Sequence, residues 1–363
     1  MSKVKLGEVA IEHKETCKGS KDGYPIVGLE HLVPEEVTLT AWDEGNDNTF
    51  TKVFRKGNIL FGRRRAYLKK AAVAPFDGIC SGDITVIEAI PDRILPELLP
   101  FIIQNDDLFD FAVGKSAGSL SPRVKWEHLK NYEFELPDME KQRELAELLW
   151  AMDATKKSYQ KLIAATDELV KSQFMEQFGS YLGDETRCAT VEQVCTVFAD
   201  GDWIESKDQA DDGIRLIQTG NVGNGVYLDK GERARYIDEE TFIRLNCTEV
   251  LPNDILISRL PDPVGRACII PDGLGKSITA VDCSIVRLKS HVLPEFFVAY
   301  TMTTLYAAQI GSSVTGSTRK RISRKNLGQV VIPTPDIDQQ EQFAAFVRQS
   351  DKSKYNASQA MRL

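Results

Sequence analysis

The chain has 363 residues, of which 42% are hydrophobic and 27% charged, and its 45 basic and 53 acidic side chains give a net charge of −8. This composition excludes a disordered or collagen-like chain, and the charge excludes a uniformly basic nucleic-acid coat protein, although it is compatible with a locally basic surface. The absence of a long apolar run, of a signal-peptide pattern and of any C-x-x-C pair among the seven cysteines predicts a cytoplasmic protein of two or three domains, with reduced thiols and no membrane segment.

The first part of the chain, residues 1–136, has the pattern of a mixed α/β domain. Short β-branched runs bounded by Gly, Pro, Asn or Asp predict strands at 84–87 and 132–136. A helical pattern with a proline near its start covers 95–111.

After Pro137 comes a stretch without glycine or proline up to Gly179, which predicts one long helix over residues 137–178. Apolar and small residues recur in it at spacings of three and four, which is typical of a coiled-coil seam, and about 40 helical residues would span about 60 Å. The predicted seam residues are Leu145, Leu148, Met152, Tyr159, Leu162 and Leu169.

After a linker at 179–190, the pattern repeats. Residues 191–334 predict a second α/β domain, with strands at 255–257 and 330–332 and a helix at 294–309, and residues 335–363 predict a second seam helix that includes Phe343 and Phe346. Matching residues in the two halves are separated by one constant offset: Gly118 and Gly316, Ser119 and Ser317, Arg123 and Arg321, Leu129 and Leu327, Pro137 and Pro335, Asp138 and Asp336, Gln142 and Gln340.

So long a period indicates a duplicated domain with its connector rather than a solenoid. We therefore predict an α/β (α+β) fold with two globular domains, separated by two long helices that bury their seams against each other in an antiparallel coiled coil with a pseudo-twofold repeat. The alternative is that each helix belongs to an ordinary compact domain.

Basic clusters in this acidic chain are the candidate nucleic-acid contacts, because arginine binds both phosphate and the guanine edge in a bidentate manner. Such clusters are more often solvated surface, but their recurrence in both halves favours a binding role. Arg63 and Arg259 are the expected base readers, and the residues beside the Gly-Ser turns are the expected phosphate contacts. The candidates are Arg63, Arg64, Arg65, Lys69, Lys115, Ser119, Arg123 and Lys125 in the first domain, and Arg259, Arg266, Ser317, Arg319, Lys320 and Arg321 in the second.

Enzymatic motifs are incomplete. Gly275-Lys276-Ser277 ends like a phosphate-binding loop, but Ile270 stands where the motif needs glycine. The chain lacks an amino-methyltransferase N/D-P-P-Y/F/W element and a nuclease carboxylate cluster, and its four histidines are scattered. We expect no catalytic, cofactor-binding or metal-binding residues, and aromatics such as Tyr67 and Trp203 are expected in the core more often than at DNA.

The duplicated segments at 118–142 and 316–342, the Gly57-Asn58-Ile59-Leu60 and Asn253-Asp254-Ile255-Leu256 strands, and the glutamine-containing first turns of both helices resemble the specificity subunit of a type I restriction-modification system. The resemblance implies two target recognition domains that each read half of a bipartite double-stranded DNA site, and a coiled coil that sets the gap between the halves. It also implies docking of two methyltransferase subunits and two restriction motor-nuclease subunits, which would use S-adenosylmethionine, ATP and Mg²⁺, while this chain would be non-catalytic.

Two other functions remain open from the residues alone. One is a stand-alone nuclease or DNA methyltransferase with unrecognised motifs. The other is a scaffold that does not bind DNA.

Overall fold

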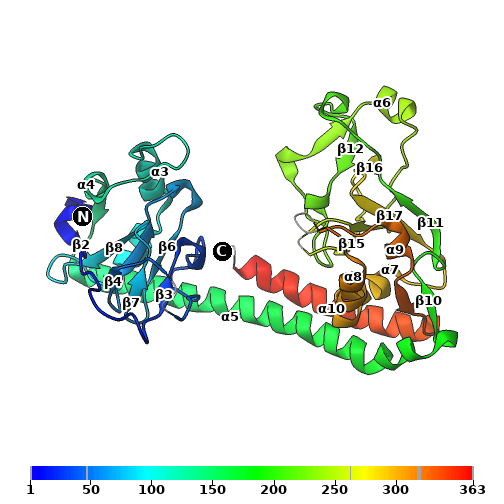
Figure 1. Cartoon of the computed structure of the whole chain (residues 1–363), viewed down its shortest axis with the longest axis horizontal. Coiled ribbons are helices and arrows are strands. Elements are labelled where there is room, and N and C mark those ends of the chain that lie inside the picture. The colour runs from blue at the N-terminus through cyan, green and yellow to red at the C-terminus, as the bar shows by residue number, and fades with distance from the viewer. Residues whose placement is uncertain (1, 46–47, 262, 317–319, 362–363) are drawn as a thin grey trace. The chain divides into compact units, whose positions relative to one another are not determined.

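A computed structural model describes residues 2–45, 48–261, 263–316 and 320–361. The chain divides into two compact units, Met1–Lys157 and Ser158–Leu363 (Figure 1). Each unit contains sheets and helices, which confirms the predicted α+β class with two domains. Among the described residues, no helix combines the length and the apolar character that a membrane crossing requires.

The first unit is built on a four-stranded antiparallel sheet in the order β2-β8-β5-β6, with a three-stranded sheet β3-β7-β4 and a two-stranded sheet β1-β9. Its strands are β1 (Ser2–Lys5), β2 (Ala10–Glu12), β3 (Ile26–Val27), β4 (Lys52–Phe54), β5 (Ile59–Gly62), β6 (Ala71–Val73), β7 (Gly78–Cys80), β8 (Ile84–Ala89) and β9 (Glu133–Leu136). Its helices are α1 (Leu6–Val9), α2 (Leu99–Ile103), α3 (Asp106–Gly114) and α4 (Trp126–Leu129), followed by the first part of α5 (Met139–Phe178).

The second unit repeats this plan with the sheets β11-β17-β14-β15, β13-β12-β16 and β10-β18. Its strands are β10 (Cys188–Thr190), β11 (Cys195–Asp200), β12 (Ile214–Ile217), β13 (Arg235–Ile237), β14 (Ile255–Ser258), β15 (Ala267–Ile269), β16 (Ser277–Thr279), β17 (Cys283–Leu288) and β18 (Val331–Pro333). Its other helices are α6 (Glu239–Arg244), α7 (Pro294–Thr301), α8 (Thr304–Ser313), α9 (Arg324–Gly328) and α10 (Ile337–Ala360).

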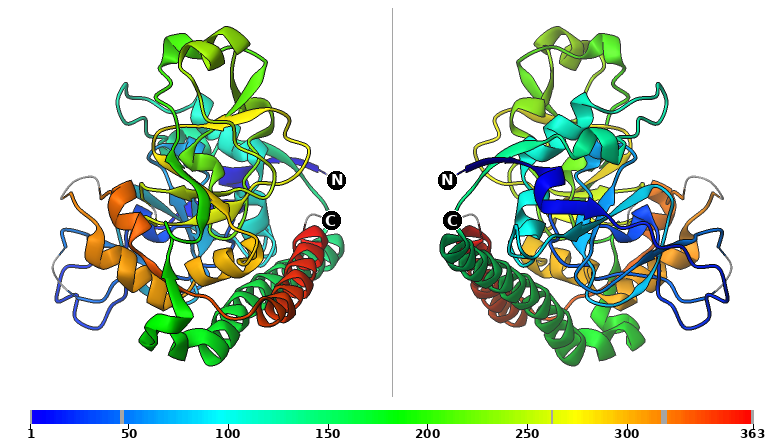
Figure 2. Two further views of the ribbon diagram at one scale, coloured as in Figure 1. Left: turned by 90° about the vertical axis from the view of Figure 1, so that its right-hand side faces the viewer. Right: turned by 90° about the vertical axis from the view of Figure 1, so that its left-hand side faces the viewer.

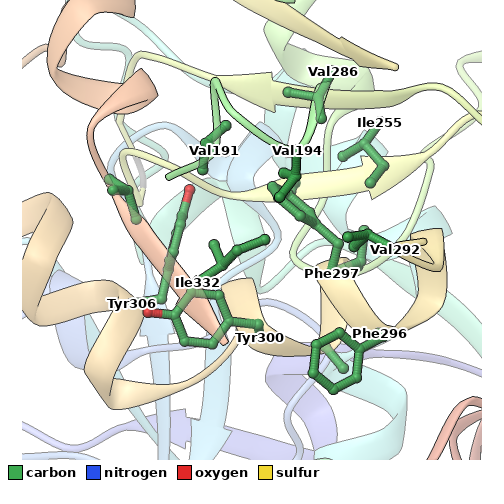
Figure 3. Packing of buried hydrophobic residues seen from close by; sticks show 14 of the residues in the cluster. Val191, Val194, Ile255, Val286, Val292, Phe296, Phe297, Tyr300, Tyr306 and Ile332 are labelled. Carbon is green, nitrogen blue, oxygen red and sulfur yellow. The ribbon is translucent and has the colours of Figure 1, made fainter. Parts of the chain in front are cut away.

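Both central strands are fully buried because their sheets are covered on both faces. In β14, Ile255 and Ile257 join one hydrophobic cluster and Leu256 joins another, as expected when successive side chains alternate between the faces of a sheet. Figure 3 shows Ile255 and Val286 of the sheet packed near Phe297 of α7. This explains why residues 255–257 of β14 and residues 59–61 of its counterpart β5 are apolar without polar alternation.

The four strands predicted at 84–87, 132–136, 255–257 and 330–332 are confirmed within one or two residues. Each helix predicted before the Gly-Ser turns is instead two helices. The Asn105 side chain accepts a hydrogen bond from Asp107 N and caps α3, and the Thr303 side chain accepts one from Tyr306 N and caps α8. These caps satisfy backbone donors of a new helix start, so the chain breaks at the same place in both copies.

A buried glutamine ties the first turn of each long helix to its unit. Gln142 Oε1 accepts a hydrogen bond from Leu95 N at 2.8 Å, and Gln142 Nε2 donates to Pro137 O at 2.8 Å. Gln340 does the same with Leu293 N at 2.9 Å and Pro335 O at 2.8 Å, and it also donates to His291 O at 2.9 Å. The repeated glutamine of the sequence is therefore an internal connector whose amide is satisfied on both sides.

In the second unit, α10 lies beside the C-terminal part of α5 (Figure 2). The Phe343 ring lies 5.4 Å from the Phe174 ring and 5.6 Å from the Phe178 ring, measured between centroids. Farther along, Lys354 Nζ lies 2.7 Å from Asp167 Oδ1. Residue numbers fall along one helix as they rise along the other, so the pairing within this unit is antiparallel.

The predicted seam is only partly buried within the two units. Phe343 is buried and Phe346 partly buried, Tyr159 is half-buried, and Leu145 packs at the edge of the first unit's core, as expected for seam residues. The seam leucines Leu162 and Leu169, however, remain 51% and 49% exposed, as do Leu148 at 58% and Met152 at 51%. The face that packs in the second unit carries Val170, Phe174 and Phe178, spaced by four, and the two phenylalanine rings pack against Phe343 of α10.

Candidate nucleic-acid interface

Three segments of the first unit meet beside its Gly-Ser turn and are joined by main-chain hydrogen bonds. Arg63 N donates to Asp83 O at 3.0 Å, and Val124 N donates to Arg63 O at 2.9 Å. Ala117 and Arg123 exchange reciprocal bonds of 3.1 and 2.9 Å across the turn. Gly118 has φ +115°, a conformation that side-chain-bearing residues rarely adopt, which explains the glycine.

The side chains on this frame converge on Asp83. Arg123 Nε donates to Asp83 Oδ1 at 2.7 Å and Arg123 Nη2 donates to Asp83 Oδ2 at 3.2 Å. Arg64 Nη1 reaches the same Oδ2 at 3.4 Å, while Arg64 Nε donates to Ser121 Oγ at 2.5 Å. The Arg123 guanidinium, and secondarily Arg64, hold the pKa of Asp83 below its usual value of 3.8, so the carboxylate is charged at neutral pH.

The second unit has the same main-chain frame. Arg259 N donates to Asp282 O at 2.9 Å, and Ile322 N donates to Arg259 O at 3.2 Å. Thr315 and Arg321 exchange two bonds of 2.9 Å, and Gly316 has φ +98°. Arg321 Nη2 lies 3.3 Å from Asp282 Oδ1. An Arg–Asp pair at equivalent places therefore occurs in both units.

Several of the side chains predicted to contact DNA are exposed and make no ion pair within the part of their unit that the structure describes. Among the described residues, Arg65, Ser119 and Lys125 have no side-chain hydrogen bond or ion pair, and Lys115 only approaches the Phe111 ring at 5.8 Å. Lys69 Nζ is paired with Asp106 Oδ1 at 2.6 Å. The remaining candidates of the second loop are Lys320, which is exposed, and Ser317 and Arg319, which lie outside the described residues.

The expected base readers are not equivalent. Arg259 is only 4% exposed: its Nη2 donates to Val281 O and its Nε lies 3.4 Å from Asp200 Oδ1. Burial lowers its pKa, and its surroundings hold it inside the unit, so the prediction that it reads bases is wrong. Arg63 is half-buried, and within the described chain its buried Nε has no hydrogen-bond partner.

The half-buried Arg266 side chain binds the main chain of its own unit. Its Nε donates to Val222 O at 2.6 Å, its Nη1 to Leu260 O and Pro263 O at 3.0 Å each, and its Nη2 to Thr219 O at 2.9 Å. All three nitrogens thus bind main-chain carbonyls, a use for which the fork of five N–H donors is well suited. These bonds hold the surrounding loops together, and the predicted contact of Arg266 with DNA stays a prediction.

The sequence interpretation did not include Asp83 and Asp282 among the site residues, although both stand at matching places in the repeat. The signal that could have identified them is the recurrence of one acidic residue at the same place in two otherwise basic regions. Tyr67 and Trp203, which were expected to be core residues, are 55% and 70% exposed.

Two other features lie apart from the basic loops. Glu30, His31 and Asp43 bring potential metal ligands within 4.8 Å of one another, but both carboxylates are exposed and His31 Nδ1 already accepts from Gly28 N at 2.9 Å. A cavity of about 600 Å³ in the second unit is lined by α5, α7 and α10 and includes Asp167, Lys354 and Met302. Neither feature adds a polar group to the Arg–Asp loops.

Comparison with known proteins gives two kinds of match. The family model of the type I restriction modification DNA specificity domain matches residues 1–165 and 186–359. No curated protein matches. Among solved structures, a chain from a study of complex assembly and conformational transition in the type I R-M system has 20% identity and a TM-score of 0.54, with coverage of 99% of this chain and 92% of that chain.

Two further structures are similar. The type I restriction-modification S subunit from M. genitalium has 11% identity and a TM-score of 0.51, with coverage of 99% of this chain and 92% of its own. The HsdS subunit from Thermoanaerobacter tengcongensis has 20% identity and a TM-score of 0.41, with coverage of 99% and 91%. At these identities, the structural likeness with the higher TM-scores concerns the fold alone, and the two segments matched by the family model correspond to the two units.

Proposed function

Since the chain belongs to the family of type I restriction-modification DNA specificity subunits, we propose that each of its two units reads one half of a bipartite DNA site. The chain supplies sequence specificity to such a system. The two target recognition domains would be residues 1–136 and 191–334, joined by residues 137–178, a linker at 179–190 and the helix at 335–363.

The observation that carries the proposal is the Arg–Asp pair on a Gly-Ser loop in both units, Arg123 with Asp83 and Arg321 with Asp282. Each loop also presents exposed cations, which suit phosphate binding. The residues that follow the central strands differ between the copies, Arg64-Arg65 in one and Leu260-Pro261 in the other. Different side chains on one frame would read different half-sites.

The long helices would act as a ruler between the half-sites. Support comes from the antiparallel contacts of Phe343 with Phe174 and of Lys354 with Asp167, which are those expected of one end of an antiparallel coiled coil. The exposed apolar residues of α5, such as Leu148 and Met152, would dock two methyltransferase subunits. Two motor-nuclease subunits would complete the restriction complex, and the cofactors S-adenosylmethionine, ATP and Mg²⁺ would belong to these partners, leaving this chain without catalysis.

Exchange of one domain tests the division into half-sites. Residues 1–136 are replaced by those of a homologue, the chimera is expressed with its methyltransferase partner, and the methylated motif is determined by methylome sequencing. We expect one half of the motif to change and the other to persist. A change in both halves, or in neither, contradicts the proposal.

Insertion of one heptad after Met152 tests the ruler. Seven helical residues lengthen α5 by about 10 Å, or about three base pairs of duplex. Both half-sites should survive with a wider gap between them. An unchanged gap would show that α5 does not set the spacing.

A further inference from the structure

Asp83 accepts hydrogen bonds from one side of the Arg123 guanidinium and leaves the N–H groups at its far end unbonded within the described residues. The pair uses Nε and Nη2, at 2.7 and 3.2 Å from the two carboxylate oxygens. Within the described residues, Nη1 of Arg123 has no hydrogen-bond partner, and the side chain is 43% exposed. A guanidinium has five N–H donors in a rigid fork, so a side-on pair leaves two parallel donors at its end, the arrangement that binds O6 and N7 of guanine.

The carboxylate that holds Arg123 is itself fixed. The Asp83 side chain is 19% exposed, and its Oδ2 also interacts with Arg64 at 3.4 Å. Asp83 N donates to Ser81 Oγ at 3.2 Å, and the main chain of Arg123 is bridged to Ala117. The side chain therefore has little rotamer freedom left to lose on binding, which makes it a preorganised reader.

A phosphate contact would gain little from this arrangement. Phosphate is bound mainly by positive charge, and a carboxylate within hydrogen-bond distance neutralises that charge. The neighbouring Arg65, Lys115 and Lys125 are exposed and carry unpaired charge among the described residues, so they suit phosphate better. In the second unit, Arg321 makes a single ion pair with Asp282, from Nη2 to Oδ1 at 3.3 Å, and 46% of its side chain is exposed.

We propose that Asp83 is a positioning residue that orients Arg123 to read a guanine in the half-site of the first unit, and that Asp282 orients Arg321 in the same way in the second. This inference rests on the proposed half-site function. It also reverses the sequence-based assignment, in which the arginines beside the Gly-Ser turns hold phosphate and Arg63 and Arg259 read bases.

The test compares charge-preserving variants in the full chain with its methyltransferase partner. Wild-type binding is first measured on duplexes that differ at each position of each half-site, which establishes the proposed function independently. Arg123→Lys keeps the charge beside Asp83 but removes the fork, and Asp83→Asn keeps the shape but removes the charge. Asp77→Asn is the matched control, since Asp77 pairs with Arg55 at 2.9 Å elsewhere in the same unit.

We expect Arg123→Lys and Asp83→Asn to lower the preference for one and the same G·C pair by about 10- to 100-fold, with the second half-site unchanged. Asp77→Asn should retain wild-type discrimination. Asp282→Asn and Arg321→Lys should relax one position in the other half-site only. If Asp83→Asn does not fold, Arg123→Lys and Arg321→Lys still test whether the arginines read guanine. Each keeps a cation opposite its carboxylate, so the ion pair that supports the fold is retained.

The opposite pattern overturns the inference. If Asp83→Asn strengthens binding to every duplex, steepens the salt dependence and leaves discrimination intact, Arg123 is a phosphate contact that Asp83 merely neutralises. Unchanged discrimination in both lysine variants would likewise show that the arginines do not read guanine. Failure of the proposed function itself appears earlier, as wild-type binding that depends on neither half-site.

Discussion

The basic loops of the two units share a backbone frame but use its arginines differently. In the first unit, Arg64 and Arg123 both interact with Asp83 and Arg63 is half-buried. In the second, Leu260 stands where Arg64 does, Arg321 pairs with the Asp282 carboxylate, and Arg259 is buried against Asp200. Main-chain hydrogen bonds thus preserve the position of a residue in a duplicated fold. The surrounding side chains decide whether its guanidinium is exposed for DNA or buried within the unit.

The largest expected effect is on the stability of the second unit when its buried arginine is removed. Arg259→Met loses the hydrogen bond to Val281 O and the interaction with Asp200, and we expect a loss of about 2–3 kcal/mol in unfolding free energy. The matched Arg63→Met in the first unit should cost about 1 kcal/mol or less, because Arg63 is less buried. Hydrogen exchange of peptides from each unit measures both, and equal losses would contradict the difference between the units.

Removal of the connector glutamines should give the next largest effect. Gln340→Ala eliminates three hydrogen bonds at a fully buried amide, and Gln142→Ala eliminates two. We expect losses of about 2–3 and about 1–2 kcal/mol, because buried backbone partners are left unsatisfied. Urea unfolding measures them, with the exposed Gln342→Ala as control; a larger effect at Gln142 would reverse the predicted order.

A smaller effect, on DNA binding alone, is expected from Arg65→Gly. Arg65 is exposed with φ +54°, so glycine fits its backbone and should leave the first unit as stable or more stable by up to about 1 kcal/mol. Loss of a phosphate contact should weaken all duplexes alike and reduce the salt slope by about one. Lys320→Gln should act similarly through the second unit. Titrations on cognate and scrambled duplexes provide the measurement, and a change in preferred sequence would make Arg65 a base reader instead.

Acid should reveal the smallest effect, at Asp83. Because Arg123 and Arg64 lower its folded-state pKa below 3.8, the stabilisation is fully present above the unfolded-state pKa and is lost as the pH falls through the lower folded-state value. The unfolding free energy of wild type relative to Asp83→Asn should be constant above about pH 4 and shrink below it, by a fraction of a kcal/mol for this partly exposed pair. A difference that grows on acidification would contradict the ion pair.

Local patterns in the chain were enough to predict the framework. A run without glycine or proline gave α5 as one helix, β-branched runs between turn residues gave strands such as β8 and β14, and the offset of Gly118 and Gly316 located two equivalent loops. These features depend on backbone preferences and on the period of side-chain burial, which neighbouring residues already express.

Tertiary structure alone decided the exposure and partners of each side chain. Arg63 and Arg259 occupy equivalent positions, yet Arg259 is buried beside Asp200, a residue distant in sequence. In the part of α5 that belongs to the second unit, Leu162 and Leu169 are exposed and Phe174 and Phe178 pack instead, because their partners Phe296 and Phe343 come from remote segments. The desolvation and ion pairing of a side chain depend on which groups from remote segments lie within a few ångströms of it. No local sequence pattern determines those neighbours.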